Sequence, residues 1–425
     1  MSGPSELLPK PAGTHVLFEK TEDWEEGGRY SVTTQTLLLP LFSDYFETQR
    51  TFCHEVIGSE PEFLIGLNAG THGDEETSIV AVQNIVRGAS FGLVAGKLVA
   101  IPYANPGAIE RRSRLVDYTP SGEADLNRSF TLKPASKIEQ HAFAILDYFR
   151  KHYESQQASK KQRGEDVSSQ WPFGGLIIDL HTEDIISGSS PESNVLPYLR
   201  IDPSENDDLL GFTMYCAIVA GIPWVMEYAT ESYKEEGLDR SLTAVLGQQL
   251  NIPAITFEAG PGGAVFPRFV TMADQVMQRL FEHFKMRIQD QPDVEGTWSE
   301  DPDLIGKLPQ IGDGNFPLKL DDAYACDQDG KPIESQGRLI LDQIKPGDFV
   351  RKGQPIGRIE DSVVPWKESI VVFAPFDGWV LSESPVQIRH QKGTLAYMAA
   401  VPITDDERLI RIYRKQKELL SSHDS

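Results

Sequence analysis

Cysteine is scarce in this chain of 425 residues, which has only Cys53, Cys216 and Cys326, far apart and without a CxxC pair. We therefore expect no disulfide framework, and the few thiols favour a reducing, cytoplasmic location. Long apolar runs are also missing. No stretch approaches the roughly 18 uninterrupted apolar residues of a transmembrane helix. The opening residues, MSGPSELLPKPAGTH, lack the apolar segment of a signal peptide.

Basic charge is the second shortage. The chain has 40 Lys and Arg residues against 63 Asp and Glu residues, which gives a formal net charge of −23. This balance argues against nucleic acid and anionic membranes as partners. The partner that we expect is a small-molecule substrate with a carboxylate, and a homo-oligomer is an open alternative. An anionic substrate would need a local basic pocket. The 40% of hydrophobic residues can supply a sizeable core, and the length predicts two domains.

Strand-like and helix-like segments alternate over residues 1–288, which predicts a layered α/β domain. Functional side chains are then expected in loops at the carboxyl ends of strands. Residues 289–317 are rich in Pro, Gly and Asp and are typical of a linker. Short strands with turn signals predict a smaller all-β domain over 318–404, followed by a helix and tail over 405–425.

Three of these strand-end loops hold unusual residues. LNAGTHGDEE (67–76) places His72 and Glu75 three positions apart, on one face of a first helical turn. Capping and hydrogen bonding explain that pair equally well. IIDLHT ends in His181, which taken alone is typical of a satisfied core histidine. Together, however, two imidazoles and one carboxylate are the ligand set of catalytic zinc sites, which leave a fourth position for water.

The third loop, ITFEAGPGG, places Glu258 at a strand end. A carboxylate there is costly unless it is paired or functional, and a zinc hydrolase needs a base beside the metal. Between the first two loops, residues 105–130 carry four arginines, which a solvated basic patch would also explain. They are Arg111, Arg112, Arg114 and Arg128. Arg128 follows Asn127 in DLNRSF, and the planar guanidinium can bind a carboxylate through two parallel hydrogen bonds.

The order H-x-x-E, N-P…R…D-L-N-R-x-F, D-L-H and F-E-A-G resembles the succinylglutamate desuccinylase/aspartoacylase family of the zinc carboxypeptidase clan. The motifs cover about residues 70–260, and the α/β pattern extends the likeness to about 288. The resemblance implies a zinc-carboxypeptidase-like mixed sheet flanked by helices. It also implies one zinc ion per chain, bound by His72, Glu75 and His181.

The same resemblance implies roles for the other residues. Glu258 would be the general base, and Arg114 would polarise the scissile carbonyl. Asn127 and Arg128 would grip a substrate carboxylate. The stretch after Arg114 is longer than is usual in the family, so Arg112 or Arg111 could take its place, and we count Arg112 among the substrate-binding candidates. The acidic residues Glu183 and Asp184 follow His181 and put negative charge near the metal. The clan often uses a tyrosine to bind substrate, and Tyr228 and Tyr233 are the two candidates.

The C-terminal segment IKPGDFVRKGQPIGRIED…APFDGWV is similar to the barrel–sandwich hybrid fold of biotinyl and lipoyl carrier domains. Val363 stands where a carrier would have its modified lysine, and Lys367 is off register. We therefore expect a structural lid, with a carrier role as the alternative.

The sequence thus predicts a zinc-dependent hydrolase that cleaves the amide bond of a small N-acyl amino acid or related compound. Two alternatives stay open. A metallocarboxypeptidase acting on peptide C-termini would use the same site. A non-catalytic, zinc-stabilised scaffold would bind a ligand or partner, but a structural zinc has four protein ligands and needs no spare base such as Glu258.

Overall fold

The computed structural model describes most of the chain. The described residues are 15–24, 30–40, 50–58, 60–93, 95–119, 122–162, 172–183, 196–228, 231–286, 305, 308, 311–312, 316–333, 337–341, 343–360, 368–383, 387–389 and 395–423. Asp184, Val363, Lys367 and most of the expected linker 289–317 lie outside them. None of the described helices is long and apolar enough to cross a membrane.

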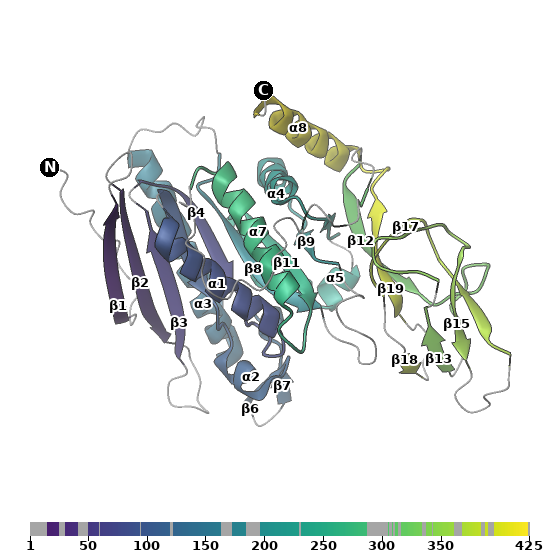
Figure 1. The fold of residues 1–425 in the computed structure, drawn as a ribbon. Helices are drawn as coiled ribbons and strands as arrows, with labels where there is room; N and C mark the ends of the chain where they lie inside the picture. The colour runs from purple at the N-terminus through teal and green to yellow at the C-terminus, as the bar shows by residue number, and fades with distance from the viewer. Residues whose placement is uncertain are drawn as a thin grey trace.

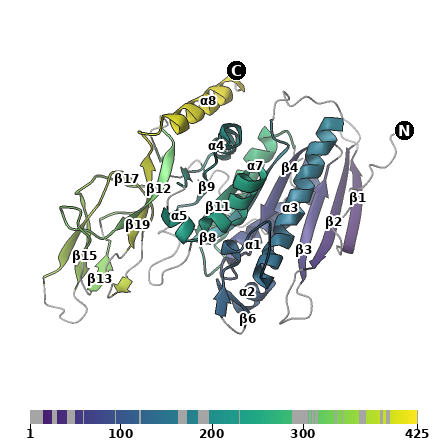
Figure 2. The same ribbon diagram turned by 180° about the vertical axis from the view of Figure 1, so that it is seen from behind.

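A mixed sheet runs through the molecule (Figures 1 and 2). Within the described residues it has 13 strands in the order β1-β2-β3-β5-β4-β8-β11-β9-β10-β12-β19-β17-β14. The strands are β1 (His15–Trp24), β2 (Tyr30–Pro40), β3 (Arg50–Ile57), β4 (Glu60–Asn68), β5 (Ala95–Ile101), β8 (Gly175–Glu183), β9 (Tyr198–Ile201), β10 (Trp224–Met226), β11 (Ala254–Pro261), β12 (Leu318–Tyr324), β14 (Phe349–Val350), β17 (Gly378–Glu383) and β19 (Leu395–Pro402). Its centre is parallel, because β4 pairs in parallel with β5 and β8, and β8 with β11.

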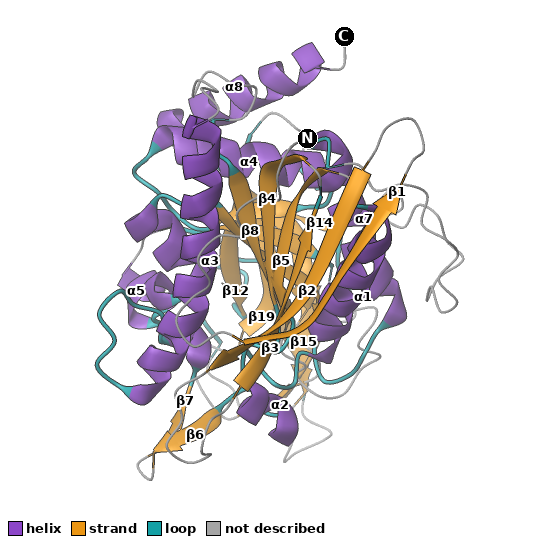
Figure 3. Ribbon diagram, turned by 90° about the vertical axis from the view of Figure 1, so that its left-hand side faces the viewer, coloured by secondary structure: helices purple, strands orange, loops and turns teal. Residues whose placement is uncertain are grey.

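Helices cover both faces of this central sheet (Figure 3). One face packs against α1 (Glu76–Gly92), α4 (Asp207–Ala220) and α7 (Pro267–His283), and the other against α3 (Lys137–Gln162). Strand β4 explains the two cores, because alternate side chains of a strand point to opposite faces. Ile65 and Leu67 lie in the first core, whereas Leu64 lies in the second. The predicted mixed sheet flanked by helices is confirmed.

Short elements connect these layers. They are α2 (Pro106–Arg111), β6 (Val116–Thr119), β7 (Gly122–Ala124), the 3₁₀ turn η1 (Leu126–Arg128), α5 (Glu231–Glu235), the 3₁₀ turn η3 (Leu238–Arg240), α6 (Leu242–Ala244) and the π-helical η4 (Val245–Gln249). Strands β6 and β7 form a small hairpin of their own. These connections carry several of the candidate site residues.

The C-terminal region consists of small antiparallel strands, as expected. A four-stranded sheet, β16-β15-β13-β18, lies beside the end of the large sheet. Its strands are β13 (Gly337–Ile340), β15 (Pro355–Glu360), β16 (Ile370–Phe373) and β18 (Gln387–Arg389). The two regions meet where β10 pairs with β12 through Met226 and Lys319. The final helix, α8 (Glu407–His423), returns to pack on α4, so Leu409 and Ile412 join the first core. The domain boundaries and the carrier-like fold stay predictions.

Candidate metal centre and active site

His72 and Glu75 follow β4 in a tight loop that leads into α1. Both side chains are buried, and Glu75 is the residue just before the first turn of α1. The loop packs so closely against α2 that a Cβ atom on Gly73 would lie 1.9 Å from the carbonyl oxygen of Ala108. Only glycine fits there, which explains the glycine of the HGDE sequence on steric grounds. The loop is thereby held with His72 and Glu75 turned inward.

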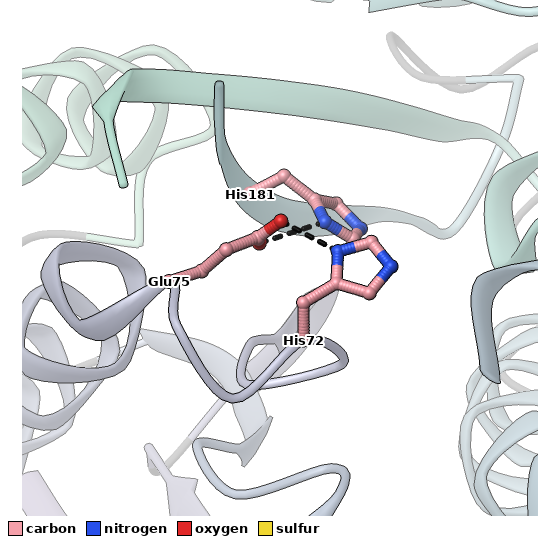
Figure 4. Close-up of side chains that lie close together, drawn as sticks. All are labelled: His72, Glu75 and His181. Atoms are coloured by element: carbon pink, nitrogen blue, oxygen red, sulfur yellow. Dashed lines mark hydrogen bonds and ion pairs between the residues drawn. The ribbon is translucent and has the colours of Figure 1, made fainter. Parts of the chain in front are cut away.

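His181 joins these two residues from the end of β8 (Figure 4). Nδ1 of His72 lies 2.5 Å from Oε1 of Glu75, and Nδ1 of His181 lies 2.9 Å from Oε2 of the same carboxylate. The ligand atoms of the three buried side chains lie within 4.8 Å of one another. They form a group that could hold a metal ion, with Nδ1 of each histidine facing the shared carboxylate.

The other ring nitrogen of each histidine faces a second carboxylate. Nε2 of His72 lies 3.0 Å from Oδ1 of Asp125, and Nε2 of His181 lies 3.0 Å from Oδ2 of Asp179. Oδ1 of Asp125 also accepts a hydrogen bond from the backbone N–H of Asn127. Carboxylates placed this way fix the ring orientation of metal-binding histidines and raise their basicity. The donor set and its support therefore fit a divalent metal such as zinc.

Sequence reasoning missed both of these carboxylates. Their signal was present, since Asp125 opens DLNRSF and Asp179 precedes His181 in IIDLHT. A further partner was not foreseeable from spacing. Asn68 donates from Nδ2 to Oδ1 of Asp179 at 2.7 Å and comes from the neighbouring strand β4. The support of His181 thus spans two strands.

The electrostatics of this group favour positive charge. Burial alone would lower the pKa of both histidines, but the carboxylates of Glu75 with Asp125 or Asp179 outweigh it and raise each pKa. Burial would likewise raise the pKa of Glu75, yet the two histidines hold it well below its usual range. A divalent cation would supply the same positive charge to neutral imidazoles.

Glu258 lies on β11 beside the metal-binding candidates. Its register partner on the parallel strand β8 is His181, and its partner on the antiparallel strand β9 is Tyr198. The side chain is buried, which raises the pKa of its carboxyl group, while His181 and Arg200 oppose that shift. A carboxyl group with a raised pKa in a pocket is suited to accepting a proton.

His72, Glu75, His181 and Glu258 open onto one pocket of about 610 Å³. Arg114, Asn127 and Arg128 line it as well. The Nη2 atom of Arg114 lies 3.4 Å from Oδ2 of Asp125, and its Nη1 atom lies 4.0 Å from Oε1 of Glu75. Arg128 donates from Nε to the carbonyl of Glu236 at 2.7 Å and from Nη1 to that of Asn127 at 3.1 Å. Those two bonds fix the direction of its guanidinium.

Arg112 lies outside this pocket. Its side chain is 79% exposed, and its Nε atom lies 3.1 Å from Oε1 of Glu76. The cause is local, because Arg112 adopts a left-handed backbone conformation as the C-cap of α2. Arg111 is also exposed. Of the four arginines in residues 105–130, the fold brings only Arg114 and Arg128 to the pocket.

The lining also includes residues that no motif indicated, beside two that the sequence had offered as candidates. Tyr198 and Arg200 come from β9, and both clan-tyrosine candidates, Tyr228 and Tyr233, also face the pocket. The outer wall comes from the C-terminal region: its residues are Lys319, Leu320, Asp321, Tyr324 and Met398. The C-terminal region therefore shapes the site directly.

Residues 64–284 match the family model described as the succinylglutamate desuccinylase/aspartoacylase catalytic domain. The chain belongs to this family. The match includes every metal-binding candidate, Glu258 and the pocket arginines. Members of the succinylglutamate desuccinylase/aspartoacylase family are hydrolytic deacylases that act on small acylated amino acids.

Several solved structures share the fold at low sequence identity. A succinylglutamate desuccinylase from Silicibacter sp. is 17% identical with a TM-score of 0.57, covering 93% of this chain and 100% of that one. A succinylglutamate desuccinylase/aspartoacylase from Rhodobacter sphaeroides is 17% identical with a TM-score of 0.59, covering 88% and 96%. The product-bound ectoine utilization protein EutE (DoeB) from Ruegeria pomeroyi is 17% identical with a TM-score of 0.57, covering 90% and 98%. No curated protein matches the chain.

Proposed function

We propose that this family member is a zinc-dependent hydrolase that cleaves the amide bond of a small N-acyl amino acid or a closely related compound. One observation carries the proposal. Two histidines share the Glu75 carboxylate through Nδ1, each has its Nε2 beside a second carboxylate, and Glu258 adjoins the group without belonging to it. Metal-assisted hydrolysis requires a set of metal ligands and a nearby carboxylate that is not itself a ligand.

In this proposal His72, Glu75 and His181 would hold one zinc ion, which supplies an activated water and a Lewis acid when bound. Asp125 and Asp179 keep the two imidazoles oriented. Glu258 accepts a proton at its carboxylate oxygen and later returns it to the leaving nitrogen.

The pocket arginines would act on the substrate itself. Arg114 faces the metal group and is positioned to stabilise negative charge on the scissile carbonyl oxygen. Asn127 and Arg128 would hold a substrate carboxylate, since the free side of the Arg128 guanidinium can form parallel hydrogen bonds with it.

The pocket size supports small substrates over peptides. A cavity of about 610 Å³ that is lined on one side by Tyr324 and Met398 has the size of pockets for small ligands. A long peptide would have to displace that wall. The scaffold alternative is disfavoured because Glu258 is kept buried beside the metal group, where a purely structural site would have no use for it.

The test is a substrate panel on the zinc-loaded full chain, with released amino acid measured by mass spectrometry. It would pair N-acyl amino acids with peptides of increasing length that have free C-termini. We expect kcat/KM to be highest for the N-acyl amino acids and to fall steeply with peptide length. Preference for peptides would establish the carboxypeptidase alternative, and zinc-loaded protein without turnover of either class would establish the scaffold.

A further inference from the structure

Arg200 is a pocket residue that no motif of the sequence singles out. It lies on β9, where Leu199 and Ile201 point into the first core and the alternate residues, Tyr198 and Arg200, point into the pocket. The antiparallel register pairs Tyr198 with Glu258 and Arg200 with Thr256. Arg200 therefore shares a sheet face with the candidate base and is held there by backbone pairing.

The guanidinium of Arg200 is buried but poorly supplied with acceptors. Its side chain is only 12% exposed, and the carboxylate within ion-pair distance among the described residues is that of Glu227, with 3.8 Å between Nε and Oε1. That separation is too long for a hydrogen bond. The buried Nε atom has no hydrogen-bond acceptor in the described part of the chain. An arginine has five N–H donors, and leaving them unsatisfied in a buried place is costly.

The surroundings keep this arginine charged. Burial would lower the pKa of Arg200, but the carboxylates of Glu227, Glu258 and Asp202 outweigh that effect and raise it. Asp202 itself is already engaged, because it accepts hydrogen bonds from the hydroxyls of Tyr233 at 2.9 Å and Thr243 at 2.6 Å. The pocket thus holds a fixed cation, and its Nε atom has no acceptor among the described residues.

Arg128 makes an instructive contrast. Two of its donors bond backbone carbonyls at 2.7 and 3.1 Å, so its orientation is set by the protein. Among the described residues, no backbone carbonyl accepts a hydrogen bond from Arg200, which comes from a different element. Burial lowers the pKa of Arg128, Asp125 raises it, and the charge of Arg200 adds to the lowering. Two like charges held near each other in one pocket point to two anionic groups on the ligand, or to one group shared between them.

We propose that Arg200 is a specificity residue that binds an anionic group of the substrate, in a subsite separate from Arg128, and that Glu227 competes with the substrate for its guanidinium. The identity of the substrate as an N-acyl compound rests on the proposed function. The binding of an anion by Arg200 does not, because it can be measured without turnover. The loose ion pair with Glu227 keeps Arg200 in place until an anion binds it more closely.

Isothermal titration of the zinc-loaded full chain with glutarate and with butyrate tests this subsite. Butyrate has one carboxylate, whereas glutarate has two. We expect the wild type to bind glutarate more tightly. Arg200→Gln should weaken glutarate binding by about 10–100-fold and butyrate binding by less than about threefold, because it removes charge-assisted hydrogen bonds to one carboxylate. The glutarate affinity of Arg200→Lys should lie between those of the wild type and Arg200→Gln.

Glu227→Gln is the matched control, because it breaks the same ion pair and keeps the guanidinium. We expect it to bind glutarate as tightly as the wild type or more tightly. If Arg200→Gln and Glu227→Gln weaken both ligands alike, or if Arg200→Gln leaves glutarate affinity unchanged, Arg200 is a structural ion-pair partner and the proposal is overturned. A wild type that prefers butyrate would overturn it as well.

The outcome is separable from that of the proposed function. A wild type that binds glutarate through Arg200 but hydrolyses no N-acyl amino acid would refute the hydrolase and leave the subsite standing. If the wild type hydrolyses N-acyl amino acids while Arg200→Gln binds glutarate normally, the subsite is refuted and the hydrolase stands.

Discussion

Glu258 and His181 are register partners on the parallel strands β11 and β8. The backbone of the central sheet therefore sets the position of the candidate base relative to the candidate metal ligand. Residues held by regular strands keep their geometry better than residues on loops. This arrangement makes the two roles separable by mutation.

Glu258→Gln should lower kcat by about 10²–10⁴-fold because it removes the basic oxygen and keeps the size of the side chain. Zinc content, measured by elemental analysis, should stay at the wild-type level. Glu235→Gln, on an exposed residue of α5, is the control and should leave kcat unchanged. Retained turnover in Glu258→Gln would move the role of base elsewhere, with Glu183 the first residue to test.

Purified protein should contain one zinc ion per chain, with ligand distances of about 2.0–2.2 Å by X-ray absorption. The double variant His72→Ala/His181→Ala should contain none. Asp125→Asn should bind zinc about 10–100-fold more weakly, because Nε2 of His72 loses its carboxylate partner. His54→Ala, which changes a histidine on β3 outside the pocket, should keep full occupancy. Full occupancy in the double variant would place the metal elsewhere.

Arg128→Lys should raise KM for the true substrate by about tenfold or more, since a point charge cannot form parallel hydrogen bonds with a carboxylate. Lysine also cannot keep both bonds to the carbonyls of Glu236 and Asn127. Arg112→Lys is the matched control, because Arg112 is exposed and outside the pocket. Steady-state kinetics check both variants. An unchanged KM in Arg128→Lys would make Arg128 structural.

The wall formed by the C-terminal region should limit substrate size. Removing the whole region is a poor test, because Leu409 and Ile412 of α8 belong to the first core. Met398→Trp instead narrows the pocket from β19 and should lower kcat/KM more for large acyl groups than for small ones. Phe349→Trp, on an exposed residue of the same region, should change neither. Equal effects of Met398→Trp on all acyl groups would contradict a role in size selection.

A buried ionic cluster away from the pocket predicts acid sensitivity. Glu55 lies 3.1 Å from Nζ of Lys97 and 3.2 Å from Nε2 of His152. Burial would raise the pKa of Glu55, but hydrogen bonds and charge from these two neighbours lower it to about 2. Because the folded-state pKa is below the ordinary value, this carboxylate stabilises the fold above about pH 4.5, and the contribution is lost as pH falls towards 2.

Urea unfolding between pH 3 and 7 measures that contribution, which should be on the order of 3 kcal/mol at neutral pH. Glu55→Gln should be less stable than the wild type at pH 7, and the difference should shrink as the pH falls. His152 acts in the same direction, since burial and Lys97 lower its pKa and its protonation at low pH opposes folding. The exposed Glu282→Gln should follow the wild type. A constant difference across this range would contradict the assignment.

The strand-end loops were predictable because each places a polar residue directly after an apolar run. That signal pointed to His72, His181 and Glu258, which the structure brings to one pocket. It did not indicate Arg200, because β9 is only four residues long. Antiparallel pairing with β11, more than fifty positions later, is what places Arg200 beside the site. Nor did the signal indicate Lys319, which reaches the pocket through pairing between strands that are distant in sequence. Arg112 was misplaced for a local reason, the left-handed cap of α2.

The pairing of β10 with β12 has a mechanical consequence. Its register consists of Met226 and Lys319, whereas β12 and β19 are paired along their whole length from Leu318 to Tyr324. The large sheet therefore has a narrow seam at the edge of the pocket, with α8 as a separate strap across it. Packing also joins the two sides there, because Tyr198 and Val225 share a buried cluster with Leu318, Leu381 and Ala400. The outer wall is thus joined to the large sheet through one register pair, whereas the strands that carry His181 and Glu258 are paired on both sides.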